Sequence, residues 1–373
     1  MRSAMRVSFR GGPVVDMPLL LSVVAIASLG VVNLYSATSY YVGAGERAGL
    51  ADIYVSQIYW IAVGFLFGIL VAVIDYRHFE RLASVLYLGG LVALGLVFVL
   101  GADIRGSARW IQIGTFTFQP SEFMKILVIL TVAKYLHNDL KTEARGLLDL
   151  APPIGFTLLP VVAVMAQPDL GTSLIYLLCL LSILAITKIR RATVIAISAV
   201  VAIGAPLLYA YVLKPYQKQR IDSFLDPGAD QTGTGWHALQ SQTAIGNGQL
   251  TGEGFMRGTQ NQFGFLPDQH SDFPFSVFAE EWGFAGGLLL LGLYGFVCVW
   301  AIHIASQAKD RFGAAVAIGV GAMIFWHAVF NVGMAMGLLP VVGITLPLFS
   351  YGGSSVLTTL IGLGLLMSVS MRR

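Results

Sequence analysis

Apolar residues run along the chain in long blocks that short polar stretches separate. A block such as "LLLSVVAIASLGVV" does not alternate apolar and polar positions, so it predicts a helix rather than a barrel strand. Blocks of about 17–25 residues can cross a bilayer core of roughly 30 Å. We therefore expect an all-α integral membrane protein, with residues 1–373 forming one polytopic domain. The expected spans are residues 17–36, 54–74, 84–100, 120–136, 152–167, 170–187, 193–213, 275–303, 313–338 and 351–371.

Composition supports this class and excludes others. Hydrophobic residues make up 56% of the chain and charged residues 12%, about half the charged fraction of a soluble domain. The net charge of +3 is too small to indicate nucleic-acid binding. Cys179 and Cys298 lie inside apolar blocks and suggest neither a disulfide framework nor a metal site. The first block resembles a signal peptide, but because many spans follow it we expect an uncleaved first span.

The basic residues predict the orientation. Ten spans put both ends of the chain on one side of the membrane. Of the 23 Lys and Arg residues, fifteen fall in loops on the side of the termini and seven on the other side, and Lys125 lies within a span. Because cytoplasmic loops carry the excess of positive charge, we expect both termini to be cytoplasmic.

One connection, residues 214–274 on the outer side, is much longer than the others. It is rich in Gly, Thr and Asn, yet it keeps large aromatic residues, among them Trp236, Phe255, Phe263 and Phe265. Long loops in compact proteins are usually functional or disordered. The aromatic residues favour an ordered loop that packs on the membrane face. No convincing internal repeat is present, which counts mildly against a transporter built from duplicated halves.

Two charged residues lie inside a span. In "FQPSEFMKIL", Pro120 suits a first helical turn, and Glu122 and Lys125 follow on one helix face. A charge within a span is costly and should point into the bundle. One interpretation is a structural ion pair between packed helices. The second, which we favour, is that one member faces an outer cavity.

Acidic residues mark the outer starts of two spans. Asp169 in "AQPDLGTS" has capping of the next span as its first interpretation, and binding of a cation or sugar as its second. Asp272 could also cap the span that Pro274 begins. Its surroundings favour a functional site, because four further ionisable residues lie near it in sequence: Asp268, His270, Glu280 and Glu281. Such crowding implies a basic partner, for which the candidates are Lys125, Arg109 and Arg257.

Three further features are weaker. In "FSYGGSS", Gly352 and Gly353 open the last span, where a helix N-terminus attracts phosphate, although paired glycines more often serve helix packing. His327 and Asn331 lie one turn apart and predict a polar pair inside the bundle. Trp110, after Arg109, could be an anchor at the membrane interface.

Several long motifs together resemble the SEDS family of bacterial membrane proteins over essentially the whole chain. They are "FQPSEFMKI", "AQPDLGTSL", "YQKQRIDSFLDPGAD", "GTQNQFGFLPDQHSDFPFSVFAEEWG" and "GLLPVVGITLPLFSYGGSS". "GTQNQ" and "LPVVGI" are more similar to the rod-shape elongation branch than to the division branch. The family pattern LPE-x-HTDF is changed mildly here, at Asp268 and Ser271.

The resemblance implies ten transmembrane helices and a peptidoglycan glycosyltransferase that acts at the outer face of the bacterial cytoplasmic membrane. The implied substrate is lipid II. The implied partners are a class B penicillin-binding protein, which is a transpeptidase, and other membrane proteins of the elongation complex. Asp272 matches the family's essential carboxylate, and Glu122 with Lys125 matches a charged pair that faces a central cavity. Trp110 matches a tryptophan of the first large outer loop.

Inverting transfer of a sugar needs one base on the attacking hydroxyl, and Asp272 is the candidate. Cations would neutralise the leaving pyrophosphate. The candidate substrate-binding residues are Lys125, Glu122, Arg109, Trp110, Arg257, His270, Asp169, Gly352 and Gly353. A divalent ion, Mg²⁺ or Mn²⁺, held by Asp272 or Asp169 is left open. So are two other functions, a lipid II flippase and a non-catalytic scaffold for the transpeptidase.

Overall fold

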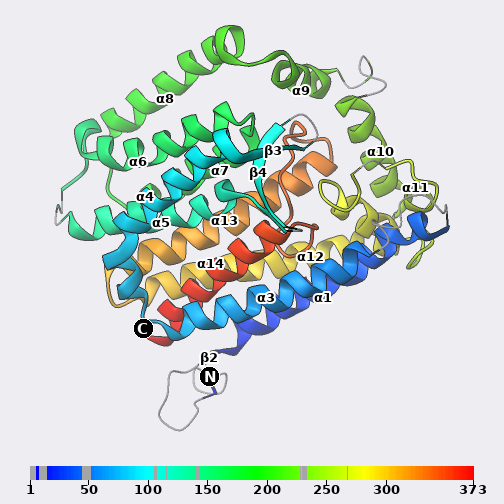
Figure 1. The fold of residues 1–373 in the computed structure, drawn as a ribbon, viewed down its shortest axis with the longest axis horizontal. Coiled ribbons are helices and arrows are strands. Elements are labelled where there is room, and N and C mark those ends of the chain that lie inside the picture. The colour runs from blue at the N-terminus through cyan, green and yellow to red at the C-terminus, as the bar shows by residue number, and fades with distance from the viewer. Residues whose placement is uncertain are drawn as a thin grey trace.

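The structure is a computed structural model dominated by long helices (Figure 1). It describes residues 6–7, 15–43, 52–104, 107–114, 116–139, 141, 143–226, 228, 233–266 and 268–373. A short two-stranded sheet, β1 with β2, precedes the first helix. Its strands are Arg6–Val7 and Val15–Asp16.

Each of the ten expected segments coincides with a helix. The ten helices are α1 (Met17–Gly43), α3 (Ile53–Val73), α4 (Tyr76–Leu100), α5 (Pro120–Asn138), α6 (Leu147–Ala166), α7 (Leu170–Ala185), α8 (Arg191–Leu207), α12 (Pro274–Ser306), α13 (Arg311–Ala335) and α14 (Gly353–Met371). A π-helical turn, η1 (Leu208–Val212), extends α8. Among the described residues, eight helices are long and apolar enough to cross a membrane, and α7 is a shorter apolar helix. The remaining helix, α5, carries the predicted charged pair.

The start of α4 is the clearest difference in boundaries. The apolar block predicts a span from residue 84, whereas the helix begins at Tyr76. Its first turns are polar, so hydropathy misses them. The Asp75 carboxylate accepts a hydrogen bond from the Arg77 backbone N–H and so caps the helix. A local cap, rather than hydropathy, therefore decides where this helix starts.

The core of the bundle lies around α13 and α14. In the most apolar stretch of α14, 89% of the residues are buried, whereas 6% are buried in the corresponding stretch of α8 and η1. α8 lies at the top edge of Figure 1. Close helix contact explains the burial of α14, which packs along α3. A Cβ added to Gly364 would lie 2.4 Å from the Gly68 carbonyl oxygen, so the backbones meet where neither helix carries a side chain.

The connection between α4 and α5 forms a sheet that hydropathy did not predict. Strands β3 (Gly101–Ile104), β4 (Ser107–Ile113) and β5 (Phe116–Phe118) pair antiparallel in the order β3-β4-β5. Gly114 turns the chain between β4 and β5 at a φ of +63°, a backbone conformation that favours glycine. This sheet carries Arg109 and Trp110 on β4.

The long segment between α8 and α12 contains three helices, as expected of an ordered loop. They are α9 (Pro215–Leu225), α10 (Thr234–Asn247) and α11 (Thr259–Gln262). In Figure 1 they lie at the end of the bundle opposite the labelled N- and C-termini. α10 packs against α12 and α13.

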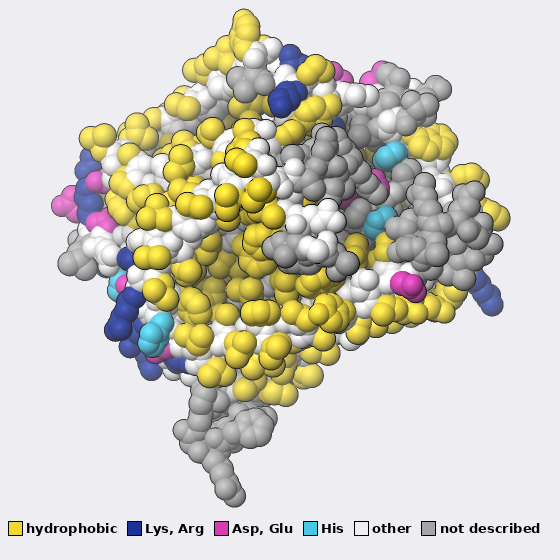
Figure 2. All heavy atoms as spheres, viewed as in Figure 1, with side chains coloured by type: hydrophobic (Ala, Val, Ile, Leu, Met, Phe, Trp, Pro, Cys, Tyr) yellow, Lys and Arg dark blue, Asp and Glu magenta, His cyan; other side chains and the backbone are white. Residues whose placement is uncertain are grey.

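The surface has the character expected in a bilayer. Hydrophobic side chains cover most of the face seen in Figure 2. Many of the visible Lys and Arg side chains gather at its left edge, at the end that holds the C-terminus. Exposed apolar side chains over so wide a face would be unfavourable in water, so lipid is the solvent that suits them.

Candidate active site

Asp272 is held by its backbone where the outer segment meets α12. Its carbonyl accepts a hydrogen bond from the Asn331 side-chain amide at 2.9 Å, and its N–H donates to the Asp268 carbonyl at 3.0 Å. The N-cap of α12 is Phe273, whose side chain makes no capping hydrogen bond. A capping role for the Asp272 carboxylate stays a prediction. Its partly exposed carboxylate stands one residue outside the helix.

The connection between α13 and α14, residues 336–352, runs beside this carboxylate. A Cβ added to Gly343 would lie 3.7 Å from Asp272 Oδ2, and Gly343 has a φ of +73°. The same Asn331 amide also donates to the Ile344 carbonyl at 2.8 Å. One side chain of α13 thus joins the backbone of Asp272 to the neighbouring loop. That loop also touches α7, because a Cβ on Gly171 would lie 2.8 Å from Ile344 Cγ1.

Asp169 and Arg109 meet at the start of α7. The Asp169 carboxylate accepts hydrogen bonds from the Thr172 N–H at 3.2 Å and the Thr172 hydroxyl at 2.9 Å, so its predicted capping role is confirmed. Arg109 reaches the same turn from β4 and lies 3.9 Å from the carboxylate. Its Nε–H donates to the Gln167 carbonyl at 3.1 Å, and its guanidinium also donates to the Pro168 carbonyl. Arg109 is therefore already bound to protein acceptors.

Arg220 is a cation of this site that the sequence analysis did not single out. It lies on α9, half-buried, and burial lowers the pKa of its guanidinium. The carboxylates of Asp272 and Asp169 act electrostatically in the opposite direction, while Arg109 repels it. One turn earlier, the Tyr216 hydroxyl donates to the Pro168 carbonyl at 3.2 Å and fixes α9 over the turn. The sequence could have pointed to Arg220 through its spacing, because it follows Tyr216 by four residues and the two therefore share one face of a helix.

Glu122 and Lys125 form a closed network inside the bundle. Lys125 Nζ lies 2.7 Å from Glu122 Oε2 and 3.0 Å from His327 Nε2, and the lysine side chain is 2% exposed. An ammonium only donates, so His327 accepts at Nε2. Its Nδ1–H therefore donates to the Thr345 carbonyl at 2.9 Å. The structure shows the ion pair of the first interpretation, tied to the loop beside Asp272.

Among the described residues, Glu280 and Glu281 form no ion pair with a basic side chain. Glu280 accepts from the N–H groups of Gln260 at 2.8 Å and Asn261 at 3.3 Å, at the start of α11. Glu281 accepts from the Ser36 hydroxyl and from the Asn261 amide. Both side chains are therefore bound by neutral donors, and Asn261 donates to both, through its backbone N–H to Glu280 and through its amide to Glu281. The basic partner expected for the acidic cluster remains a prediction for the other members.

Three other predicted residues are spread around the site. His270 is buried, and its carbonyl accepts from the Tyr351 N–H at 2.9 Å, which joins the segment before α12 to the start of α14. Trp110 is half-buried on β4, opposite Ala102 of β3. Arg257 is exposed and packs beside Gly254.

The glycine pair that opens α14 is used for packing. A Cβ on Gly353 would lie 2.8 Å from the Trp60 ring, and the Gly352 N–H faces Gln57 Oε1 at 3.4 Å. Both contacts are with α3. The structure thus places this helix start against a neighbouring helix, as the packing alternative expected.

Asp169, one of the two candidate ligands of a divalent ion, is already bound within the protein. Within the described part of the chain, no group of three or more His, Cys, Asp or Glu side chains could hold a metal. Asp169 uses both carboxylate oxygens on Thr172, and Gln119 Nε2 donates to one of them at 3.3 Å. We therefore derive no step through a metal.

Comparison with known proteins identifies the family. The profile of the cell cycle protein family FtsW/RodA/SpoVE matches residues 17–373. The chain belongs to this family. The resemblance to the SEDS proteins is thereby confirmed, and the motifs at Glu122, Asp169 and Asp272 all lie within the matched region.

Relatives with names include members of both the elongation and division branches. The peptidoglycan glycosyltransferase MrdB of Escherichia coli K12 is 37% identical over 340 residues, which cover 91% of this chain and 90% of that one. The peptidoglycan glycosyltransferase RodA of Treponema pallidum is 33% identical and covers 98% of this chain and 99% of its own. Proteins named probable peptidoglycan glycosyltransferase FtsW also match, for example at 35% identity in Trichlorobacter lovleyi.

Solved structures of this family share the fold. A chain from a peptidoglycan synthase complex, described as coordinating polymerization and crosslinking, superimposes with a TM-score of 0.81 at 33% identity. That match covers 95% of this chain and 97% of the other. The rod shape determining protein RodA of Thermus thermophilus matches with a TM-score of 0.70 at 30% identity, over 96% of this chain and 97% of that one.

Proposed function

We propose that this family member is a peptidoglycan glycosyltransferase that polymerises lipid II into glycan strands during cell elongation and rod-shape maintenance. The observation that carries the proposal is the position of Asp272. Backbone hydrogen bonds fix it just before the start of α12, and its carboxylate acts electrostatically on the half-buried Arg220. Relatives named RodA and MrdB that match over nine-tenths of the chain or more support this activity.

The proposed topology has ten spans with both termini in the cytoplasm and residues 214–274 outside the bacterial cytoplasmic membrane. Ten helices match the ten expected segments, and the two termini lie at the same end of the bundle in Figure 1. The excess of basic residues on that side supports a cytoplasmic location. Asp272 then lies at the outer water–lipid boundary, the depth at which sugars on a lipid anchor would meet it.

In the proposed reaction, a sugar hydroxyl oxygen attacks the anomeric carbon of a second, diphosphate-linked glycan. A new C–O bond forms, the C–O bond to the diphosphate breaks, and the lipid diphosphate leaves with the electron pair. Attack from the opposite face inverts the configuration. Asp272 takes the proton of the attacking hydroxyl, a role for which it must be ionised at the working pH. Positive side chains at the outer end offset the charge that grows on the diphosphate.

The remaining candidates divide by what already holds them. Arg109 contributes positive charge from a fixed position, because Asp169 and two carbonyls bind it. Glu122 and Lys125 act through His327, which holds the loop beside Asp272 at the Thr345 carbonyl. We assign them a supporting role rather than direct contact with the diphosphate, because Lys125 is buried in an ion pair.

The proposed partner is a class B penicillin-binding protein, with other elongation-complex membrane proteins around it. The superposition on a chain from a peptidoglycan synthase complex supports this assignment, because that complex couples polymerization to crosslinking. A transpeptidase that receives new strands needs a polymerase beside it, so the two reactions fit one assembly.

The test is polymerisation of purified lipid II, with strand length measured on gels. Wild type and Asp272→Asn are compared, each with and without the transpeptidase. We expect Asp272→Asn to lower the initial rate by about 10²- to 10⁴-fold, the contribution typical of general base catalysis. Asp226→Asn is the matched control, because it neutralises an exposed carboxylate of the same outer segment.

Other outcomes would support the other two functions. Movement of lipid II across liposomes without polymer would indicate a transporter. Equal strand synthesis by the wild type and Asp272→Asn, each bound to the transpeptidase, would indicate a scaffold.

A further inference from the structure

The cations near Asp272 differ in how fully the protein satisfies them. Arg109 has an ion pair and two carbonyl acceptors. Arg220 forms no ion pair with any carboxylate of the described residues, and its interactions with Asp272 and Asp169 act at longer range. Arg220 is nevertheless half-buried. A guanidinium that has lost part of its water without gaining a close counter-ion is unfavourable, and a bound anion would correct it.

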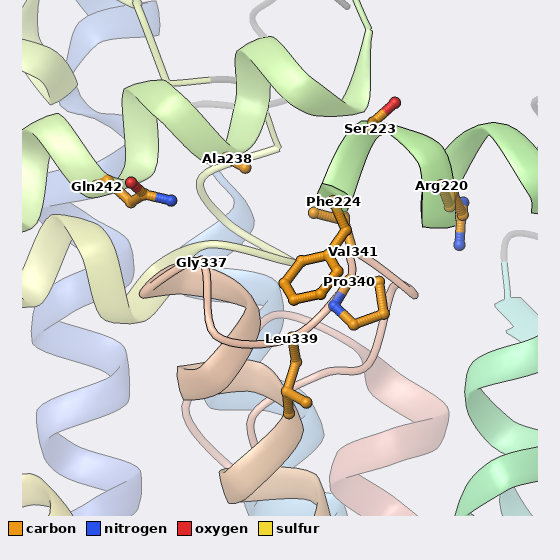
Figure 3. A pocket seen from close by; sticks show the side chains of 9 residues that line it. All are labelled: Arg220, Ser223, Phe224, Ala238, Gln242, Gly337, Leu339, Pro340 and Val341. Carbon is orange, nitrogen blue, oxygen red and sulfur yellow. The ribbon is translucent and has the colours of Figure 1, made fainter. Parts of the chain in front are cut away.

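Arg220 also lines a small, open pocket of about 20 Å³. Figure 3 shows this pocket between α9, α10 and the turn that follows α13. Its walls are Arg220, Ser223 and Phe224 of α9, Ala238 and Gln242 of α10, and Gly337, Leu339, Pro340 and Val341 of the turn. The pocket therefore offers one cationic wall among mostly apolar ones.

The pocket adjoins the proposed base. Its wall residue Val341 lies two residues before Gly343, whose Cβ position is 3.7 Å from Asp272 Oδ2. An anion held at Arg220 would thus lie within electrostatic reach of the carboxylate that accepts the proton. Arginine suits a phosphate better than a point charge does, because its planar fork can donate two parallel hydrogen bonds.

We propose that Arg220 binds the diphosphate of a lipid-linked sugar and holds it beside Asp272. This inference rests on the proposed function and names a binding residue for it. When the C–O bond to the diphosphate breaks, the electron pair stays on the diphosphate oxygen and the hydroxyl proton passes to Asp272. Arg220 offsets the negative charge that the leaving group gains. The residue therefore contributes both to binding and to the rate of the chemical step.

The direct test is binding of undecaprenyl diphosphate to the full chain in nanodiscs, followed by native mass spectrometry. We expect Arg220→Gln to weaken this binding by about 10- to 100-fold, the range of a lost charge-assisted hydrogen bond. Arg220→Lys should recover part of the loss because it keeps the charge. Undecaprenyl monophosphate should lose less affinity than the diphosphate, because a single phosphate offers fewer oxygens to the guanidinium fork.

Lys218→Gln is the matched control. Lys218 has the same charge on the same helix, but its ammonium donates to the Ala210 carbonyl at 3.0 Å and lies 5.6 Å from the centre of the Tyr209 ring. We expect its variant to bind undecaprenyl diphosphate like the wild type. A thermal unfolding curve for each variant identifies loss of folding, and Arg220→Lys keeps the test open if Arg220→Gln is unstable.

Two results would overturn the inference. One is equal affinity of wild type and Arg220→Gln for undecaprenyl diphosphate. The other is an equal loss in Lys218→Gln, which would indicate a general effect of charge. The proposed function fails separately: a wild type that binds undecaprenyl diphosphate through Arg220 but never polymerises lipid II would keep this binding residue and refute the polymerase.

Discussion

Two regions of this protein hold charged side chains away from water, and they differ in how completely those charges are paired. Inside the bundle, Lys125 donates to Glu122 and His327, and His327 donates onward to Thr345, so each charge has a close partner. At the outer end, Arg220 forms no ion pair among the described residues, and the Asp272 carboxylate acts on it electrostatically. We call the first region, Glu122, Lys125 and His327, the closed region because its charges are bound by close partners. We call the second, around Arg220 and Asp272, the open region because its arginine has no close counter-ion among the described residues. A buried charge is therefore a weak sign of chemistry when its hydrogen bonds are complete.

The two regions are also connected. His327 and Asn331 lie one turn apart on α13, and both bind backbone carbonyls of the loop that follows it. Asn331 additionally binds the carbonyl of Asp272. The closed network thus fixes the backbone on which the open one stands. Removing a member of the closed region should mainly lower stability, whereas removing a member of the open region should mainly lower binding or the polymerisation rate.

The largest effect on stability is expected from Lys125→Met. It leaves the Glu122 carboxylate buried without its counter-ion, which should cost about 3–5 kcal/mol of unfolding free energy. Titration with SDS in bicelles would measure the loss. The matched double variant, Glu122→Gln with Lys125→Met, removes both charges and should recover most of the stability. If the single variant is as stable as the wild type, the closed network does not hold the bundle together.

A smaller loss is expected from Gly343→Ala, at the junction of the two regions. Gly343 has a φ of +73°, where an L-residue costs about 1–2 kcal/mol, and its Cβ would only touch Asp272 Oδ2. We expect reduced stability and a reduced polymerisation rate, because the strained loop shifts beside Asp272. Gly89→Ala is the control, since its Cβ meets nothing within 4 Å on α4. Unchanged polymerisation in a measurably destabilised Gly343→Ala would separate the loop from catalysis.

The sequence predicted the helices better than it predicted either charged region. Apolar blocks locate ten helices because lipid imposes length and hydropathy on each span separately. The spacing of Glu122 and Lys125 places both on one helix face. The interpretation favoured from the sequence was that one member faces an outer cavity, whereas the structure pairs them inside the bundle. Arg220 was not predicted as a site residue, because its charged neighbours come from β4, the start of α7 and the turn before α12. Only the fold brings these segments together. The sheet β3-β4-β5 escaped for a similar reason, since short strands carry little hydropathy signal.

The smallest expected effect concerns Asp169. It lies near the open region, but its carboxylate oxygens already accept hydrogen bonds from Thr172, as the groups of the closed region do from their partners. Asp169→Ala removes the acceptor that caps α7 and should cost about 1 kcal/mol. Asp169→Asn keeps an acceptor of nearly the same shape, so it should unfold like the wild type in the same SDS titration. Its lost charge then affects Arg109, which still donates to two carbonyls, and Arg220, on which Asp169 acts electrostatically. Equal destabilisation by Ala and Asn would mean that the 3.9 Å pairing with Arg109 outweighs the cap. In that case the two regions would not differ in the completeness of their hydrogen bonds. Stability at the outer end would instead depend on its net charge.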